Sequence, residues 1–364
     1  MTSITPRLDA LLNTESFQAL AQERLSTMAF DYYRSGAWGE WTLQANVDAW
    51  KEISLLPRSL VDVSRRNLSC EILGMRLPFP LLIAPTAMQC MADAQGEVAT
   101  ARAAANAGVP MVLSSLSTRS IEDVVNASSA DVVMQIYISS DRGFTKALAQ
   151  RAQSAGCKAL MVTVDTPVWG VRERDIHNGF CVPQGMSIVN LQRPGQPTGH
   201  SGSGMGAALG WTIDASLTWK DLEVIRQAVN IPVMVKGILR ADDAERAFDH
   251  GAAAVVVSNH GGRQLDGAAP TARALPAIVA RVAGRGPIIV DGGIRRGVDI
   301  VRALALGANA VQVGRPILWG LAAGGEAGVA RVLQILFQEF DLAMALVGCA
   351  DVSAVTADLM CPRP

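Results

Sequence analysis

The stretch PVMVKGILRADDAERAFDHGAAAVVVSNHGG, residues 232–262, contains the unit from which the fold is built. Its outer parts, PVMVKG (232–237) and AAVVVSN (253–259), are short, apolar and rich in branched residues, which is typical of strands covered on both faces. Between them, ADDAERAFDHG (241–251) combines alanine with spaced charges and ends in glycine, as a helix before a turn does. The stretch therefore predicts a strand, a helix and a second strand parallel to the first.

The same alternation is repeated along most of the chain. Six further apolar runs have strand character: PLLIAP (80–85), PMVLSS (110–115), VVMQIY (132–137), ALMVTVD (159–165), PIIVDGG (287–293) and NAVQVG (309–314). Alanine-rich, helix-like segments separate them. Eight strand–helix units in about 235 residues are the number and size of a closed (β/α)8 barrel, the TIM barrel. An open doubly wound sheet is the alternative, but the fingerprint of a dinucleotide-binding sheet is missing.

We expect a single domain over residues 1–364, with the barrel at 80–348 and a C-terminal tail at 349–364. Residues 1–79 form an N-terminal extension with helical character. The glycine- and proline-rich loop at about 175–217, after the fourth strand, predicts a flexible lid.

Two local patterns bear on this organisation. The segment GSGMGA (202–207) fits a dinucleotide-binding pattern, but no strand precedes it, so it is rejected as a nucleotide site. The segment EAGVARVLQILFQEFDLAMALVG (326–348) predicts a packing helix. Its apolar face consists of Val329, Leu333, Leu336, Phe340 and Val347.

Composition excludes several classes of protein. The net charge is −1, so no basic surface favours nucleic acid, and no apolar run is long enough to span a membrane. Six scattered cysteines without a C-x-x-C pair argue against a disulfide framework and a zinc site, and favour buried structural thiols in a reducing compartment. No secretory signal is recognisable at the N-terminus, and the last residues, CPRP, are not a peroxisomal address. We therefore expect a cytoplasmic protein without nucleic-acid, membrane or metal partners.

Polar residues and glycines gather where the predicted strands end. In a barrel of this kind, active sites assemble at the carboxyl ends of the strands. His260 is the histidine at such an end, and Asp165 follows the fourth strand, which suggests a base held in one tautomer by a carboxylate. Arg172 and Arg263 suit a substrate carboxylate, and we expect Asp266 to orient Arg263.

The ends of the last two strands favour a phosphate. Glycines in DGGIRRG (291–297) and VGRP (313–316) let backbone amides approach an anion, and the helix that follows presents its positive end. Arg295 and Arg315 add guanidinium groups. Lys236 brings a fixed positive charge, which is useful beside a cofactor that becomes anionic on reduction.

Six motifs in this order resemble one family: APTAM (84–88), VDTPVWGVRERD (164–175), VKG (235–237), SNHGGRQLDG (258–267), DGGIRRG and VGRP. They are similar to those of the FMN-dependent 2-hydroxy acid oxidases and dehydrogenases, which include glycolate and lactate oxidases. The resemblance extends over nearly the whole chain. It implies oxidation of an (S)-2-hydroxy acid to the 2-oxo acid, with O2 as acceptor giving H2O2, in a homotetramer or octamer.

The resemblance also implies roles for individual residues. His260 would be the base, supported by Asp165, while Tyr137 would hydrogen-bond near the substrate hydroxyl. Arg172, Arg263 and Tyr32 would hold the substrate carboxylate. FMN would contact Pro85, Thr86, Ala87, Ser114, Gln135, Thr163, Lys236, Ser258, Asp291, Gly292, Gly293, Arg295, Gly314 and Arg315.

The chain departs from glycolate oxidase at the predicted substrate pocket. Leu116 stands where glycolate oxidase has tryptophan. Trp169 and Val171 occupy positions at which glycolate oxidase has smaller or basic residues. This favours lactate, or a longer or aromatic 2-hydroxy acid, over glycolate. A dehydrogenase using a quinone or cytochrome and a flavin-dependent isomerase without net redox change remain as alternatives. A hydrolase built on Ser258 and His260 is disfavoured, because the chain has no G-x-S-x-G elbow.

Overall fold

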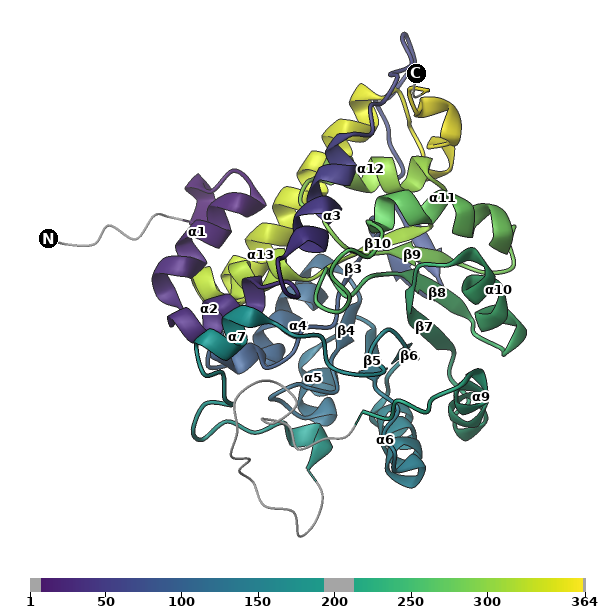
Figure 1. Cartoon of the computed structure of the whole chain (residues 1–364). Coiled ribbons are helices and arrows are strands. Elements are labelled where there is room, and N and C mark those ends of the chain that lie inside the picture. Colours follow the sequence, from purple (N-terminus) through teal and green to yellow (C-terminus); the bar gives the residue numbers. More distant parts are fainter. Residues whose placement is uncertain (1–7, 193–212, 363–364) are drawn as a thin grey trace, which may run out of the picture.

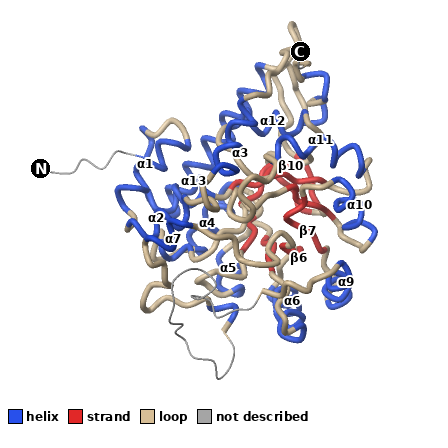
Figure 2. Tube along the Cα trace, in the orientation of Figure 1, coloured by secondary structure: helices blue, strands red, loops and turns tan. Residues whose placement is uncertain are grey.

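A closed barrel of eight parallel strands forms the centre of the protein (Figure 2, red). The computed structural model describes residues 8–192 and 213–362. Consecutive strands are neighbours, and the last strand pairs with the first to close the barrel. The strands are β3 (Leu81–Ile83), β4 (Met111–Leu113), β5 (Val132–Ile136), β6 (Ala159–Thr163), β7 (Val233–Ile238), β8 (Ala254–Val257), β9 (Ile288–Val290) and β10 (Ala310–Val313). The predicted (β/α)8 barrel is confirmed, and the open sheet is excluded.

Helices surround the barrel on its outside (Figure 1). Those that follow the strands are α4 (Glu97–Ala107), α5 (Ile121–Ala127), α6 (Arg142–Ala155), α7 (Glu173–His177), α9 (Trp219–Ala228), α10 (Ala241–Asp249), α11 (Thr271–Val282), α12 (Gly297–Ala305) and α13 (Arg315–Leu346). The N-terminal extension contributes α1 (Thr14–Arg24), α2 (Thr27–Arg34) and α3 (Trp41–Lys51). Short 3-10 turns are Leu8–Ala10, Gln89–Met91, Val189–Leu191, Val352–Ala354 and Ala357–Leu359.

Local sequence explains where several of these helices start. The side chain of Ser120 accepts a hydrogen bond from the amide of Asp123 at the start of α5, and Asp141 accepts one from Phe144 at the start of α6. Both residues cap otherwise unpaired amides of a first turn. In α9, Thr218 and Asp221 form a reciprocal capping box.

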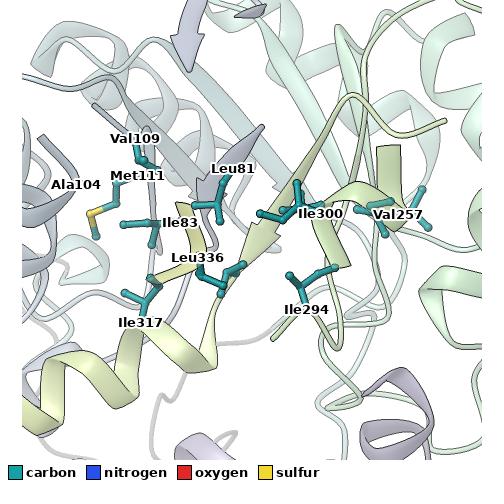
Figure 3. Packing of buried hydrophobic residues seen from close by; sticks show 14 of the residues in the cluster. Leu81, Ile83, Ala104, Val109, Met111, Val257, Ile294, Ile300, Ile317 and Leu336 are labelled. Carbon is teal, nitrogen blue, oxygen red and sulfur yellow. The ribbon is translucent and has the colours of Figure 1, made fainter. Parts of the chain in front are cut away.

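The last helix, α13, packs along the barrel and is interrupted at Gly324 and Gly325. Its second half contains the predicted packing face, because Val329, Leu333, Leu336 and Phe340 are buried, as is Val347 just beyond the helix. Figure 3 shows Ile317 and Leu336 near the side chains that β3 turns outward. The predicted role of this segment is therefore confirmed.

Below the strand ends, apolar side chains fill the inside of the barrel. Inward residues such as Val133, Met161 and Ile289 are fully buried in one cluster. The cluster also includes Ile72, Met75 and Leu77 from an antiparallel hairpin, β1 (Cys70–Ile72) with β2 (Met75–Leu77). The polar residues stand at the carboxyl ends of the strands. The apolar hairpin therefore covers the other end of the barrel, where the strands begin. The sequence predicted helix alone in residues 1–79, so the hairpin is an addition to that prediction.

Other sequence predictions are tested only in part. The proposed lid at about 175–217 contains part of α7 and a 3-10 turn, and Ile213 bridges to Ser139. Residues 193–212, with GSGMGA and His200, lie outside the described residues. Of the six thiols, none forms a disulfide. Cys157 and Cys349 are buried but Cys181 and Cys361 are exposed, so the prediction of buried thiols is wrong for part of the set.

Candidate active site

A pocket opens where the carboxyl ends of the eight strands meet. Each strand contributes a residue to its wall at or near its carboxyl end: Pro85, Ser114, Tyr137, Thr163, Lys236, His260, Asp291 and Gly314. Side chains far apart in the sequence thereby converge on one space, as they do in barrels of this type.

Most of the residues singled out from the sequence line this pocket. They are Tyr32, Pro85, Thr86, Ala87, Ser114, Leu116, Gln135, Tyr137, Thr163, Trp169, Arg172, Lys236, His260, Arg263, Asp291, Gly292, Gly293, Arg295, Gly314 and Arg315. Two others stand directly behind the lining: Asp165 contacts His260, and Ser258 contacts Lys236. Further lining residues were not predicted, namely Tyr33, Ala84, Gly261, Ile294, Gln312, Val313 and Leu318. Gln312 had a signal in the sequence, since it is polar within an apolar strand.

His260 and Asp165 form a hydrogen-bonded pair at this pocket. His260 Nδ1 lies 2.9 Å from Asp165 Oδ1. Burial lowers the pKa of His260, although Asp165 acts in the opposite direction. Burial alone would raise the pKa of Asp165, but His260 and Lys236 hold it below its ordinary value. At neutral pH the carboxylate is therefore ionised and the imidazole neutral, with its proton on Nδ1 and Nε2 left as a base.

The backbone of the loop after β8 places this imidazole. His260, Gly261 and Gly262 all have left-handed backbone angles, with φ of 58°, 63° and 76°. For His260 this is an uncommon conformation that the surroundings must stabilise. Asn259 supplies such support, because its carboxamide exchanges two hydrogen bonds of 2.8 Å with that of Asn46 in α3.

Two guanidinium groups face the same space. The side chain of Arg172 is 3% exposed, and its nearest carboxylate, that of Asp175, is 3.8 Å away. Burial and the neighbouring Arg263 lower the pKa of Arg172 to about 10. Arg263 donates hydrogen bonds to the carbonyls of Tyr32 and Ser35 and lies over the Tyr32 ring. Two like charges held this close favour the binding of an anion between them.

Neutral side chains at the carboxyl ends of β4, β5 and β6 form a hydrogen-bonded chain in the pocket wall. Gln135 donates to the Thr163 hydroxyl at 2.9 Å and accepts from the amide of Ser115 at 3.1 Å and the hydroxyl of Ser114 at 3.3 Å. These bonds fix the orientation of the Gln135 carboxamide. Donors and acceptors at the end of neighbouring strands suit the polar edge of a planar heterocycle.

Lys236 and Asp291 form a charged pair in the pocket lining. Lys236 Nζ donates to the Ser258 hydroxyl at 2.9 Å and lies 3.2 Å from Asp291 Oδ2. The other oxygen of Asp291, Oδ1, is buried and has no hydrogen-bond partner among the described residues. A buried carboxylate oxygen of this kind suits a ligand hydroxyl, because leaving it unpaired is costly.

The last two strand ends fit a phosphate, though not entirely as predicted. Burial lowers the pKa of both Arg295 and Arg315, and within residues 8–192 and 213–362 neither forms an ion pair with a carboxylate. However, Arg315 already donates to the carbonyls of Tyr33, Ser35 and Gly261. Both guanidinium groups still lack a carboxylate counter-ion among the described residues, and an anion would neutralise their charge.

The predicted contribution of a helix N-terminus to the anion site is wrong for α12, the helix after β9. The amides of Arg295 and Arg296 donate to Asp299, and the amide of Gly297 donates to Glu339. The start of α12 is thus capped by carboxylates of the chain itself. The guanidinium groups and Asp291, rather than this helix, make the site fit FMN, which has a phosphate and a hydroxylated chain.

Asp266 does not orient Arg263, contrary to the sequence-based expectation. Its carboxylate accepts hydrogen bonds from the amides of Trp41 at 3.3 Å and Thr42 at 2.8 Å, at the start of α3. Asp266 therefore ties the N-terminal extension to the loop that carries His260. Sequence reasoning also missed Asn46, because no local pattern marks a helical asparagine as the partner of a residue 213 positions away.

In residues 8–192 and 213–362, no helix is both long and apolar enough to cross a membrane. Over the same ranges, no cluster of three or more His, Cys, Asp or Glu side chains is arranged to hold a metal ion.

Comparisons with known proteins agree with this geometry. A family model described as FMN-dependent dehydrogenase matches residues 21–362. The L-lactate oxidase of Nostoc sp. is 50% identical over 356 residues, which are 96% of this chain and 98% of that protein. Glycolate oxidase 1 of Zea mays is 44% identical over 348 residues, 95% of this chain and 94% of that protein.

Solved structures show the same fold. A mandelate oxidase with 3,3-difluoro-2-hydroxy-3-phenylpropionic acid superposes with a TM-score of 0.88 at 38% identity, covering 97% of this chain and 99% of that chain. Mandelate oxidase with benzoyl-formic acid gives the same TM-score, identity and coverage.

Proposed function

The chain belongs to the FMN-dependent dehydrogenase family, and from that premise we propose that it oxidises (S)-2-hydroxy acids to 2-oxo acids with O2 as acceptor. The observation that carries the proposal is the position of the His260–Asp165 pair in one pocket with Arg172 and Arg263. A neutral base beside two guanidinium groups suits a substrate that must lose a proton while its carboxylate is held. The named relatives support it, since lactate, glycolate and mandelate are all 2-hydroxy acids.

Under this proposal, the polar residues of the pocket have separate roles in binding and proton transfer. Arg172 and Arg263 bind the substrate carboxylate, with the Tyr32 hydroxyl as a further donor, because burial raises its pKa and keeps it protonated. Tyr137, whose pKa burial also raises, hydrogen-bonds near the substrate hydroxyl. His260 Nε2 accepts the proton that the substrate loses, and Asp165 stabilises the resulting imidazolium.

FMN, when bound, supplies the acceptor for the two electrons that leave the substrate carbon. Asp291, Arg295 and Arg315 would hold its hydroxylated chain and phosphate, and Gln135 and Thr163 would meet its ring. Lys236 would place a positive charge nearby. In balance, the acid loses two electrons and two protons, and O2 gains them to give H2O2.

We propose lactate, or a longer 2-hydroxy acid, as the preferred substrate over glycolate. Leu116 is buried at the pocket wall, 3% exposed. Trp169 forms the neighbouring wall, its ring 5.8 Å from that of Tyr137 at an angle of 66°. This apolar lining suits a substrate with an alkyl or aryl group at carbon 2.

Replacement of Leu116 by tryptophan tests this preference. The larger ring should occupy space beside the substrate and lower kcat/KM for lactate relative to glycolate by about tenfold or more, the usual effect of a methyl-sized change in a pocket. The measurement is the ratio of the two kcat/KM values. Leu346→Trp is the control, because Leu346 is 66% exposed at the end of α13. An unchanged ratio in Leu116→Trp would show that position 116 does not select the substrate.

The pH dependence of kcat/KM should report the protonation of the His260 imidazole. Only the neutral imidazole accepts a proton, so activity should fall as the pH drops through the pKa of His260. Because burial lowers this pKa, the midpoint should lie below the ordinary 6.5. Asp165 raises the pKa of His260, so Asp165→Asn should move the midpoint to still lower pH. A midpoint above 6.5 in the unchanged protein, or no acid limb, would contradict the assignment.

An anaerobic substrate series tests the proposed function itself. FMN-loaded protein is mixed without oxygen with lactate, glycolate and mandelate, and flavin absorbance is followed before air is admitted. Bleaching identifies the substrate, and rapid recovery in air identifies O2 as acceptor. Bleaching without recovery would favour a dehydrogenase that needs a quinone or cytochrome. Absence of bleaching by every acid would favour an isomerase.

A further inference from the structure

The side chain of Gln264, next to Arg263, connects two loops of the pocket rim. Its Nε2 donates to the carbonyls of Asp165 at 2.9 Å and Val168 at 3.0 Å. Its Oε1 accepts from the amide of Gly170 at 3.1 Å. Both amide hydrogens and the amide oxygen are thus directed at one segment, residues 165–170, from the loop after β8. No other side chain of either loop makes so many bonds to the opposite loop among the described residues.

Gly170 shows how closely the two loops approach. A Cβ atom placed there would lie 2.3 Å from the carbonyl oxygen of Arg263 and 2.8 Å from the Cα of Gln264. Both neighbours are backbone atoms, which cannot move aside as the end of a side chain can. A glycine at this position is therefore required by close packing.

The segment held in this way carries two parts of the site. Asp165, at its start, is the partner of His260, and Trp169, near its end, is a wall of the pocket. Residues 165–170 form neither helix nor strand, and Val168 is 64% exposed. A surface loop of this kind keeps one conformation only through specific contacts.

We propose that Gln264 is a positioning residue that sets the geometry of the His260–Asp165 pair and of Trp169 by fixing segment 165–170. Gln264 is not among the residues that line the pocket. By holding the backbone of Asp165, it keeps the carboxylate opposite His260 Nδ1, so that the proton stays on Nδ1 and Nε2 faces the substrate. The effect on catalysis rests on the proposed role of His260 as the base.

The alternative is that Gln264 only stabilises the fold. In that case its loss would lower the melting temperature but leave the tautomer of His260 and the relation between kcat and KM unchanged. A positioning role predicts instead that the tautomer of His260 and the rate of flavin reduction change in a folded protein. A small displacement of a base lowers the rate without unfolding the protein.

The experiment compares four variants of the FMN-loaded protein. Gln264→Ala removes all three bonds. Gln264→Glu keeps the size and the acceptor for Gly170 but places a carboxylate against two carbonyls. Gly170→Ala pushes the loops apart through backbone contacts and leaves the side chain of Gln264 unchanged. Leu265→Ala is the matched control, since this neighbouring side chain is 71% exposed.

Two measurements are made on each variant. Nitrogen-15 NMR of labelled histidine reads the tautomer of His260 without substrate, and the four histidines of the chain keep the spectrum simple. Stopped-flow absorbance reads the rate of flavin reduction by lactate. We expect mixed tautomers and reduction slowed by about 10–10²-fold in the first three variants, and no change in Leu265→Ala.

The outcomes separate the inference from the proposed function. A single Nδ1–H tautomer in Gln264→Glu and Gly170→Ala, with unaltered reduction, overturns the positioning role. If no 2-hydroxy acid reduces the unchanged protein, the proposed function fails, but the NMR comparison still decides whether Gln264 positions the pair. If Gln264→Ala does not fold, the near-isosteric Gln264→Glu gives the decision.

Discussion

Replacing His260 by asparagine should slow flavin reduction by a 2-hydroxy acid by about 10²–10⁴-fold, the usual contribution of a positioned base. Asparagine is chosen because His260 has a φ of 58°, and asparagine tolerates this left-handed conformation better than alanine does. The backbone of the loop, and with it Gly261 and Gly262, should stay in place. FMN should therefore remain bound, and the loss should concern the chemical step. Stopped-flow absorbance at saturating substrate measures it.

A matched histidine controls for the substitution. His250 follows α10, and its Nδ1 lies 2.7 Å from Glu223, outside the pocket. His250→Asn should reduce its flavin at the unchanged rate. If His260→Asn did the same with FMN bound, another group would have to be the base.

Replacing Arg172 by methionine should weaken recognition of the substrate carboxylate. Charged hydrogen bonds contribute about 1.5–3 kcal/mol, so kcat/KM for lactate should fall about 10–10²-fold. The methyl ester of lactate has no carboxylate, so its kcat/KM should change little. The ratio of acid to ester is the quantity to measure. This ratio separates loss of an anion site from general damage, which would affect both compounds.

A nearby arginine provides the comparison. Arg174 is paired with Glu40 and Asp31 and its side chain is 40% exposed. Arg174→Met should leave the preference for the acid over the ester unchanged. Equal losses for acid and ester in Arg172→Met would mean that Arg172 acts by supporting the loop, not by binding the carboxylate.

The sequence predicted what depends on local pattern. Each strand of the barrel lies in a short apolar run. A polar residue near its carboxyl end, such as Lys236 or His260, could be assigned to the rim because parallel strands end at the same side. The positions of His260 and Asp165 at strand ends also suggested that they form a pair, and the structure brings their side chains to 2.9 Å.

What the sequence could not predict depends on contacts between distant segments. Asp266 was expected to act on a neighbour three positions away, but it caps α3, more than 220 positions away. Asn46 and Gln264 have no feature that separates them from ordinary surface amides until the loops are placed. The hairpin β1–β2 was missed because its strands, CEI and MRL, each have a charged residue between two others and form no continuous apolar run, unlike the barrel strands of the same length.

The hairpin beneath the barrel also has a kinetic consequence. Since β1 and β2 cover the amino-terminal end and Val133, Met161 and Ile289 fill the space above them, that side offers no passage. Under the proposed function, acid and product would therefore exchange at the opposite end of the barrel, at the rim where Arg172 and His260 stand. Under the proposed function, a lingering 2-oxo acid would obstruct the next acid directly.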